Sequence, residues 1–218
     1  MFRSKRRPLI FTQADHARFA ATIALNWRER PALPFDSFVR GVADHDRGYG
    51  EHDDAEIGVV DNVRWVEIQR AGFRPRGEDP VVDLVAALHI RRLLSPPEDE
   101  LELAALAELD ELLPTLVSAA GVTREAAEAA DAVTNVCDRI AFAFPFEEPA
   151  TGEARGIAYR LDGQGVVEVD PLAARRPCAP RARARVRSGR LPGAACSDGR
   201  AVRAPTAVGG APLVAART

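Results

Sequence analysis

The sequence predicts a mostly α-helical fold with a small C-terminal β-hairpin. Three observations lead to this prediction: apolar residues recur at helical spacing between residues 14 and 142, prolines and glycines separate these segments, and two short alternating runs follow from residue 156. The chain has 218 residues, of which 46% are hydrophobic and 28% charged, a composition typical of a soluble globular domain with its own core.

The helical pattern divides into separate elements. Five helices are expected, over residues 14–30, 35–46, 80–94, 98–120 and 123–142. Pro114 is expected to kink or divide the fourth helix, because proline lacks the N–H that the helix needs. Gly121 provides a stop signal and Thr123 a cap for the fifth helix.

The remaining segments are extended or ambiguous. Residues 8–12 are expected to form a short strand or an extended lead-in. Residues 55–77 combine a weak β pattern with loop residues and allow no assignment. The runs 156–161 and 166–170 flank the turn Asp162-Gly-Gln-Gly, which predicts the hairpin.

Charge divides the chain into two regions, 1–170 with a net charge of −12 and 171–218 with +9. Alanine, arginine, proline and glycine supply 34 of the last 48 residues, which is too little apolar surface to offset the entropy of ordering. We expect a helical domain over 1–170 and a tail that is disordered or translated out of frame. Arginines suit contacts with nucleic-acid phosphates, but the tail has no aromatic residues and the body is acidic, so nucleic acid is not expected as a partner.

The length of the apolar runs and the spacing of the cysteines limit the cellular compartment and the kinds of disulfide or zinc site that we expect. The longest apolar runs fall short of the roughly 18 residues of a membrane helix, and polar residues interrupt the basic N-terminus, so a cytoplasmic protein without membrane contact is expected. Three cysteines without a Cys-x-x-Cys spacing predict neither a disulfide framework nor a zinc ribbon.

Histidines and aspartates on the inner helix faces form the candidate site. His16 shares a face with apolar residues of the first expected helix, His89 does so in the third, and the pair His45-Asp46 follows the buried stripe of the second. Asp138 lies on a polar stripe of the last helix with Asp131 and Asn135. A single such histidine is usually a hydrogen-bonded core residue, but burying five polar groups together favours a shared divalent metal ion over a purely structural network.

The order of these residues resembles the HD-domain superfamily of metal-dependent phosphohydrolases. Shorter phrases resemble a bacterial family of unknown function that looks HD-like, over residues 8–170: Gln13-Ala-Asp-His16-Ala17, His45-Asp-Arg-Gly48-Tyr49 followed by Asp53, Leu88-His89, and Cys137-Asp-Arg-Ile. The resemblance implies an HD-domain-like helical bundle.

The same resemblance implies roles for individual residues. His16, His45, Asp46 and Asp138 would hold Mn, Fe or Zn, which the sequence does not distinguish. His89 would bind a second metal ion or act as an acid near the leaving group, and Asp53 would contact substrate or support the ligands. In a metal-dependent phosphohydrolase, Asp46 or Asp138 would also orient a metal-activated water. Arg47, Arg91 and Arg92 are the nearest cations in the sequence that could hold the phosphate of a small substrate. The alternative is a non-catalytic helical domain in which the cluster is a structural or ligand-sensing centre.

Overall fold

The computed structural model describes the backbone of residues 2–3, 10–54, 60–143, 150–154, 157–161, 167–171, 184–188 and 202–204. The helices are α1 Gln13–Leu25, α2 Phe35–Ala43, the 3-10 helix η1 Gly50–Asp54, α3 Asn62–Phe73, α4 Pro80–Leu93, α5 Glu100–Ala119 and α6 Arg124–Ala143. The strands are β1 Phe2–Arg3, β2 Ile10–Phe11, β3 Ala150–Ala154, β4 Ile157–Leu161, β5 Val167–Pro171, β6 Ala184–Ser188 and β7 Val202–Ala204. The mostly α-helical prediction is therefore confirmed.

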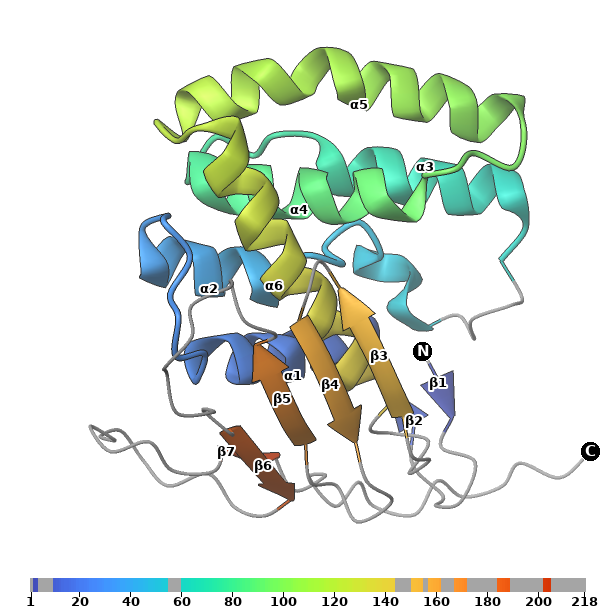
Figure 1. Cartoon of the computed structure of the whole chain (residues 1–218). Coiled ribbons are helices and arrows are strands. Elements are labelled where there is room, and N and C mark those ends of the chain that lie inside the picture. The colour runs from blue at the N-terminus through green and yellow to red at the C-terminus, as the bar shows by residue number, and fades with distance from the viewer. Residues whose placement is uncertain are drawn as a thin grey trace, which may run out of the picture.

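Helix α4 is the centre of the fold. It contacts α2, α3, α5 and α6, and it crosses the middle of the molecule in Figure 1. Every residue from Val81 to Ile90 is buried, as expected for a helix surrounded by other elements. The two polar residues within this buried stretch, Asp83 and His89, must therefore find their partners inside the protein.

Two apolar cores lie on either side of α4. One joins α1, α2 and α6 through residues such as Phe38 and Ile140, and the other joins α3, α4 and α5 through residues such as Leu84 and Leu109. Helices α4 and α6 contribute to both cores, so they fix the two halves of the bundle relative to each other.

A β-sheet packs against one end of the bundle. The strand order is β3-β4-β5-β6-β7, antiparallel throughout except for the parallel pair β6 and β7. Strands β3 and β4 contact α6 (Figure 1), where Tyr159 is buried. A separate antiparallel pair joins β1 and β2.

The extended segments test several expectations. The pairing of β4 with β5 confirms the predicted hairpin strands, although the turn between them lies outside the described residues. Strand β3 was not predicted. The expected strand in residues 8–12 is present as β2, and the domain boundary at residue 170 stays a prediction, with β6 and β7 beyond it.

The helices differ from expectation in three places. Helix α1 ends at Leu25 rather than near residue 30, and the backbone N–H of Asn26 closes the last turn. Helix α5 runs through Pro114 as one helix. Residues that showed weak β character begin α3, because Asp61 caps that helix through a side-chain bond to the N–H of Arg64.

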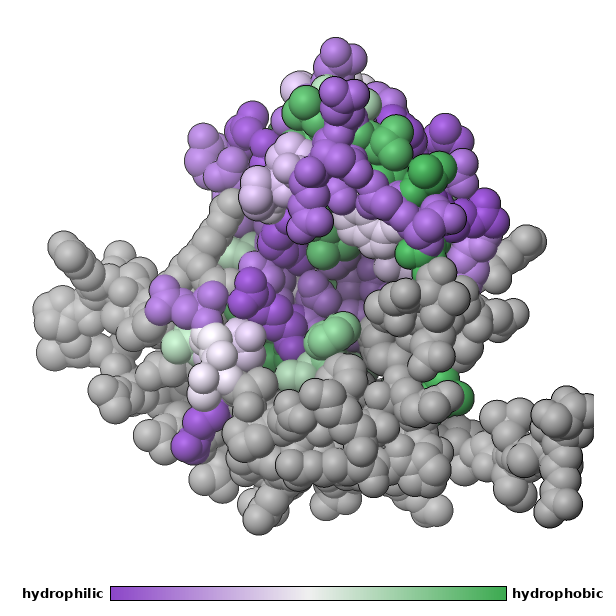
Figure 2. Space-filling view, turned by 90° about the vertical axis from the view of Figure 1, so that its right-hand side faces the viewer, coloured by the Kyte–Doolittle hydropathy of each residue, from purple (hydrophilic) through white to green (hydrophobic). Residues whose placement is uncertain are grey.

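The helical surface is mostly polar. Figure 2 shows a predominantly hydrophilic face over the described helices, interrupted by separate apolar patches. On α5, Glu108, Asp110 and Glu111 are exposed to solvent. Among the described residues, the helices are too short or too polar to cross a membrane.

Candidate metal centre

Four helical segments bring the five predicted site residues into one cluster, which we call the His/Asp cluster: His16, His45, Asp46, His89 and Asp138. His16 comes from α1, His89 from α4 and Asp138 from α6, while His45 and Asp46 lie in the turn that follows α2. All three histidines are at most 4% exposed. The structure therefore confirms that these side chains meet, whereas their roles as ligands stay a prediction.

Backbone contacts orient His45 toward the cluster. Its Nδ1 lies 2.6 Å from the carbonyl oxygen of Val42, which can only accept, so Nδ1 carries a proton. When the ring is neutral, the lone pair is therefore on Nε2. That atom is buried and has no hydrogen-bond partner in the described structure. A bond of this kind is what usually fixes the tautomer of a metal-binding histidine.

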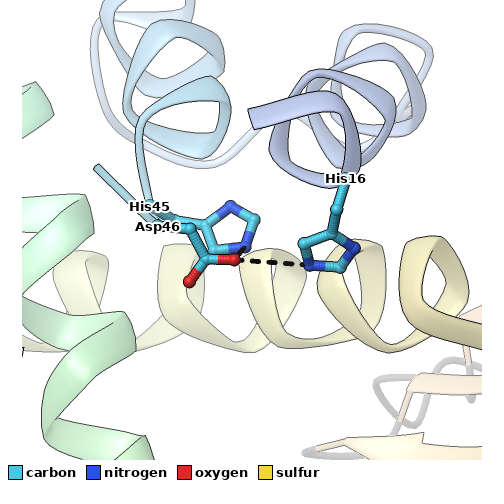
Figure 3. A group of neighbouring side chains, drawn as sticks. All are labelled: His16, His45 and Asp46. Carbon is cyan, nitrogen blue, oxygen red and sulfur yellow. Dashed lines mark ion pairs between the residues drawn. The ribbon is translucent and has the colours of Figure 1, made fainter. Parts of the chain in front are cut away.

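Two overlapping groups of three residues, His16 with His45 and Asp46, and His45 with His89 and Asp138, each bring possible ligand atoms within 4.8 Å of one another. The Nε2 of His16 is 3.0 Å from Asp138 Oδ1 and 3.7 Å from Asp46 Oδ2. The Nε2 of His45 is 3.4 Å from Asp46 Oδ2 and 3.7 Å from Asp138 Oδ1. Figure 3 shows the His16 and His45 rings approaching the same carboxylate oxygen of Asp46.

These separations fit a metal ion. Ligand atoms at about 2.1 Å from a tetrahedral zinc ion would lie about 3.4 Å from one another. The four separations given above, 3.0 to 3.7 Å, lie on either side of this value. Imidazole nitrogens and carboxylate oxygens are also common ligands of first-row divalent ions. The residues present therefore fit the metal that the sequence predicts.

His89 occupies a different position in the cluster. Its Nδ1 accepts a hydrogen bond of 2.9 Å from Arg92, since a guanidinium can only donate. The proton of a neutral His89 ring is therefore on Nε2, which lies 3.3 Å from Asp46 Oδ1 but makes no hydrogen bond of good geometry. A neutral His89 ring therefore offers a hydrogen-bond donor toward Asp46, while His89 also belongs to a possible ligand group with His45 and Asp138.

Arg92 is itself held by carboxylates. Its NH1 lies 2.7 Å from Asp131 Oδ1, and its NH2 lies 3.3 Å from Asp138 Oδ2. The polar stripe of α6 drew attention to Asp131 in the sequence. Its pairing with Arg92 could not be predicted from that stripe. Sequence reasoning treated Arg92 only as a cation for phosphate and missed its contacts with the cluster.

Burial and nearby charges shift the pKa values of His45 and His89 in opposite directions. Burial by itself would lower the pKa of His45, but the charges of Asp46 and Asp138 outweigh burial and raise this pKa to about 9. Burial and the neighbouring charge of His45 lower the pKa of His89. Burial would raise the pKa of Asp138, yet its bond from His16 and the histidine charges hold that pKa below its usual range. His89 is thus neutral near pH 7.

Asp53 lies at the start of α1 rather than in the cluster. Its carboxylate accepts the backbone N–H of Gln13 at 2.6 Å and of Ala14 at 3.1 Å, so it caps the helix that carries His16. The predicted catalytic role of Asp53 is untested. His52, which the sequence left without a role, lies beside Arg64 instead of joining the cluster.

Arg47 corrects an expectation, because it is not available to hold a phosphate. Its side chain is 3% exposed and pairs with Asp83 at 2.7 Å. Its other nitrogens donate to the carbonyl oxygens of Gly72 and Arg74. A close approach of Gly48 to the backbone of α3, where a Cβ would collide with the carbonyl of Ile68, holds the turn in place.

Comparison with known proteins gives one match. Residues 2–187 match the model of a family described as protein of unknown function (DUF3891). No curated protein and no solved structure matches the chain.

Proposed function

Since the chain belongs to the DUF3891 family, whose description assigns no function, we propose from its site that it is a metal-dependent phosphohydrolase. The observation that carries the proposal is the convergence of His16, His45, Asp46 and Asp138 with ligand atoms 3.0 to 3.7 Å apart. The buried, unpartnered Nε2 of His45 supports it, because an unsatisfied buried polar group costs about 1–3 kcal/mol.

Those four residues would hold one divalent ion, with Mn, Fe and Zn all compatible with the donor atoms. A bound ion of this kind supplies a water of lowered pKa and neutralises charge on a phosphate. The order of these residues along the chain resembles that of the HD-domain superfamily, which favours the same chemistry.

The neighbouring residues would manage the proton and the phosphate. A neutral His89 ring has its N–H on Nε2 without a good acceptor, so it is suited to donate a hydrogen bond that stabilises the charge developing on a leaving oxygen. Asp46 faces both His45 and His89 and can orient a water molecule between them. Arg92 donates to His89 and thereby keeps the proton on the side that faces Asp46.

A non-catalytic centre is the second candidate, and limited access favours it. The side chains of Asp46 and Asp138 are 9% and 18% exposed, and the histidines are almost fully buried. A closed ligand shell is typical of structural metal sites.

Metal analysis of the full chain tests the proposal. The parent is stripped with a chelator, reloaded with Mn²⁺, Fe²⁺ or Zn²⁺, and compared with His45→Gln, Asp138→Asn and the matched control His52→Gln. We expect stoichiometric metal in the parent and the control and its loss from the two cluster variants. At a free-ion concentration 100 times Kd, metal should raise the free energy of unfolding by about 2.7 kcal/mol.

A screen of phosphoesters with the reloaded parent then separates the two candidates. Hydrolysis that is lost in His45→Gln and Asp138→Asn but retained in His52→Gln supports the phosphohydrolase. Tight metal binding with no turnover would favour the non-catalytic centre. A parent that binds no metal after reloading would contradict both.

A further inference from the structure

A pocket of about 410 Å³ opens beside the His/Asp cluster, between α4, α5 and α6. Figure 1 shows these three helices meeting at an angle above the β-sheet. We call it the arginine pocket, because its lining includes three arginines: Arg91, Arg92 and Arg124. Its volume is within the range of small-molecule binding sites.

Two of these arginines, Arg91 and Arg124, are held only by exposed ion pairs. Arg91 pairs with Asp110 at 2.6 Å and Arg124 with Glu128 at 3.1 Å, and all four side chains are at least 38% exposed. Exposed ion pairs contribute only about 0–1 kcal/mol, so an incoming dianion can replace the carboxylates at little cost. Arginine forms stronger, bidentate bonds to phosphate. Each of the three arginines already pairs with at least one carboxylate, so a phosphate would bind by replacing the exposed partners Asp110 and Glu128.

Arg92 connects this pocket to the His/Asp cluster. Among the described residues that line the pocket, it is the one that contacts both His89 and Asp138. Its pairing with Asp131 at 2.7 Å holds the guanidinium at the boundary. An anion bound by Arg92 would therefore lie next to the cluster rather than at a distant surface.

Apart from Ser95 and Asn135, the uncharged lining of the pocket is apolar. Leu88 comes from α4, Leu113, Pro114 and Val117 come from α5, and Ala127 and Ala132 from α6. A free inorganic anion would leave this surface unused, whereas a ligand with an apolar body would cover it.

We propose that the arginine pocket binds an organic phosphate monoester, with its phosphate held jointly by Arg91, Arg92 and Arg124 and its apolar part against α5. This assignment rests on the proposed phosphohydrolase function and specifies the substrate class of that site.

Binding of phenyl phosphate to the metal-loaded full chain, measured by titration calorimetry, tests the proposal. The pocket variant is Arg91→Gln/Arg124→Gln. The matched control is Arg70→Gln/Arg64→Gln, which removes the same charge and the same kinds of ion pair, one to α5 and one within a helix, outside the pocket. We expect the pocket variant to bind about tenfold more weakly than the parent, and the control to bind like the parent. Equal affinity of parent and pocket variant would overturn the proposal.

A second variant tests the apolar side. Val117→Trp should weaken the binding of phenyl phosphate while leaving the binding of inorganic phosphate unchanged. The retained binding of inorganic phosphate shows that the chain is folded. Unchanged binding of both ligands would contradict the placement of the apolar part against α5.

Turnover measured in the same samples separates this proposal from the phosphohydrolase itself. Binding that follows the arginines without any turnover would refute the hydrolase and keep the pocket. Turnover that the pocket variant leaves unchanged would keep the hydrolase and refute the pocket.

Discussion

Consecutive residues of one turn enter two different buried polar regions. Arg47 enters an ion pair with Asp83, in which both side chains are 3% exposed. The pair is satisfied by the protein alone: Arg47 also donates to two backbone carbonyls, and Asp83 also accepts the N–H groups of Arg76 and Gly77 at 3.0 and 2.9 Å. Such completeness is typical of a structural network.

The His/Asp cluster, which the two preceding residues His45 and Asp46 join, is also buried, but its hydrogen bonding is incomplete. The Nε2 atoms of His45 and His89 have no hydrogen-bond partner in the described structure, although carboxylates lie 3.3 to 3.7 Å away. Native proteins rarely leave buried polar atoms unsatisfied without a functional reason. The comparison teaches that burial alone does not distinguish the two regions, whereas the unsatisfied imidazole nitrogens of the cluster do.

Breaking the Arg47 ion pair should have the largest effect on stability. Arg47→Met leaves the Asp83 charge buried and unpaired, which should lower the free energy of unfolding by about 3–5 kcal/mol. Urea denaturation of the full chain measures this change. Metal bound per folded chain should be unchanged, because Arg47 contributes no ligand to the cluster.

The double variant Arg47→Met/Asp83→Leu is the control for that experiment. Removing both charges should recover most of the lost stability, since no unpaired charge remains. A double variant as unstable as Arg47→Met would show that the ion pair is not the cause.

A smaller effect is expected at the cap of α1. Asp53→Ala should cost about 1 kcal/mol of stability, and it should weaken metal binding by about tenfold because His16 follows in the same helix. Asp61→Ala is the matched control: it removes the cap of α3, which carries no cluster residue, and should cost similar stability without changing metal affinity.

The Asp53 variants also test the catalytic role that the sequence predicts for this residue. Loss of hydrolysis with unchanged metal affinity would support that role over helix capping. Equal loss of affinity in both cap variants would contradict the specific link between Asp53 and His16.

The smallest effect is expected from acid titration of the structural pair. Burial would raise the pKa of Asp83, but bonds from Arg76, Gly77 and Arg47 outweigh it and lower that pKa below 3.8. The resulting stabilisation is present above pH 3.8 and is lost as pH falls through the lower folded-state value. The free energy of unfolding of the parent should therefore fall in acid relative to that of the Arg47→Met/Asp83→Leu double variant. A constant difference between the two would contradict the shift.

Local signals were sufficient for most of the helical fold. Proline and aspartate at the start of α4, and threonine at the start of α6, mark boundaries that the structure confirms. Helix α3 escaped detection because its buried face includes Gln69 and Gly72, which hide the apolar period. Pro114 failed to divide α5, because the packing of Leu113 and Leu116 holds that helix together.

The sequence by itself determined the membership of the His/Asp cluster, because helical periodicity places His16, His89 and Asp138 on inner faces. Only the tertiary structure decided which partners the polar side chains after α2 contact. A loop side chain has no periodic direction, so its partner depends on which distant segment packs against it. That packing placed Arg47 beside Asp83 and Asp53 at the start of α1.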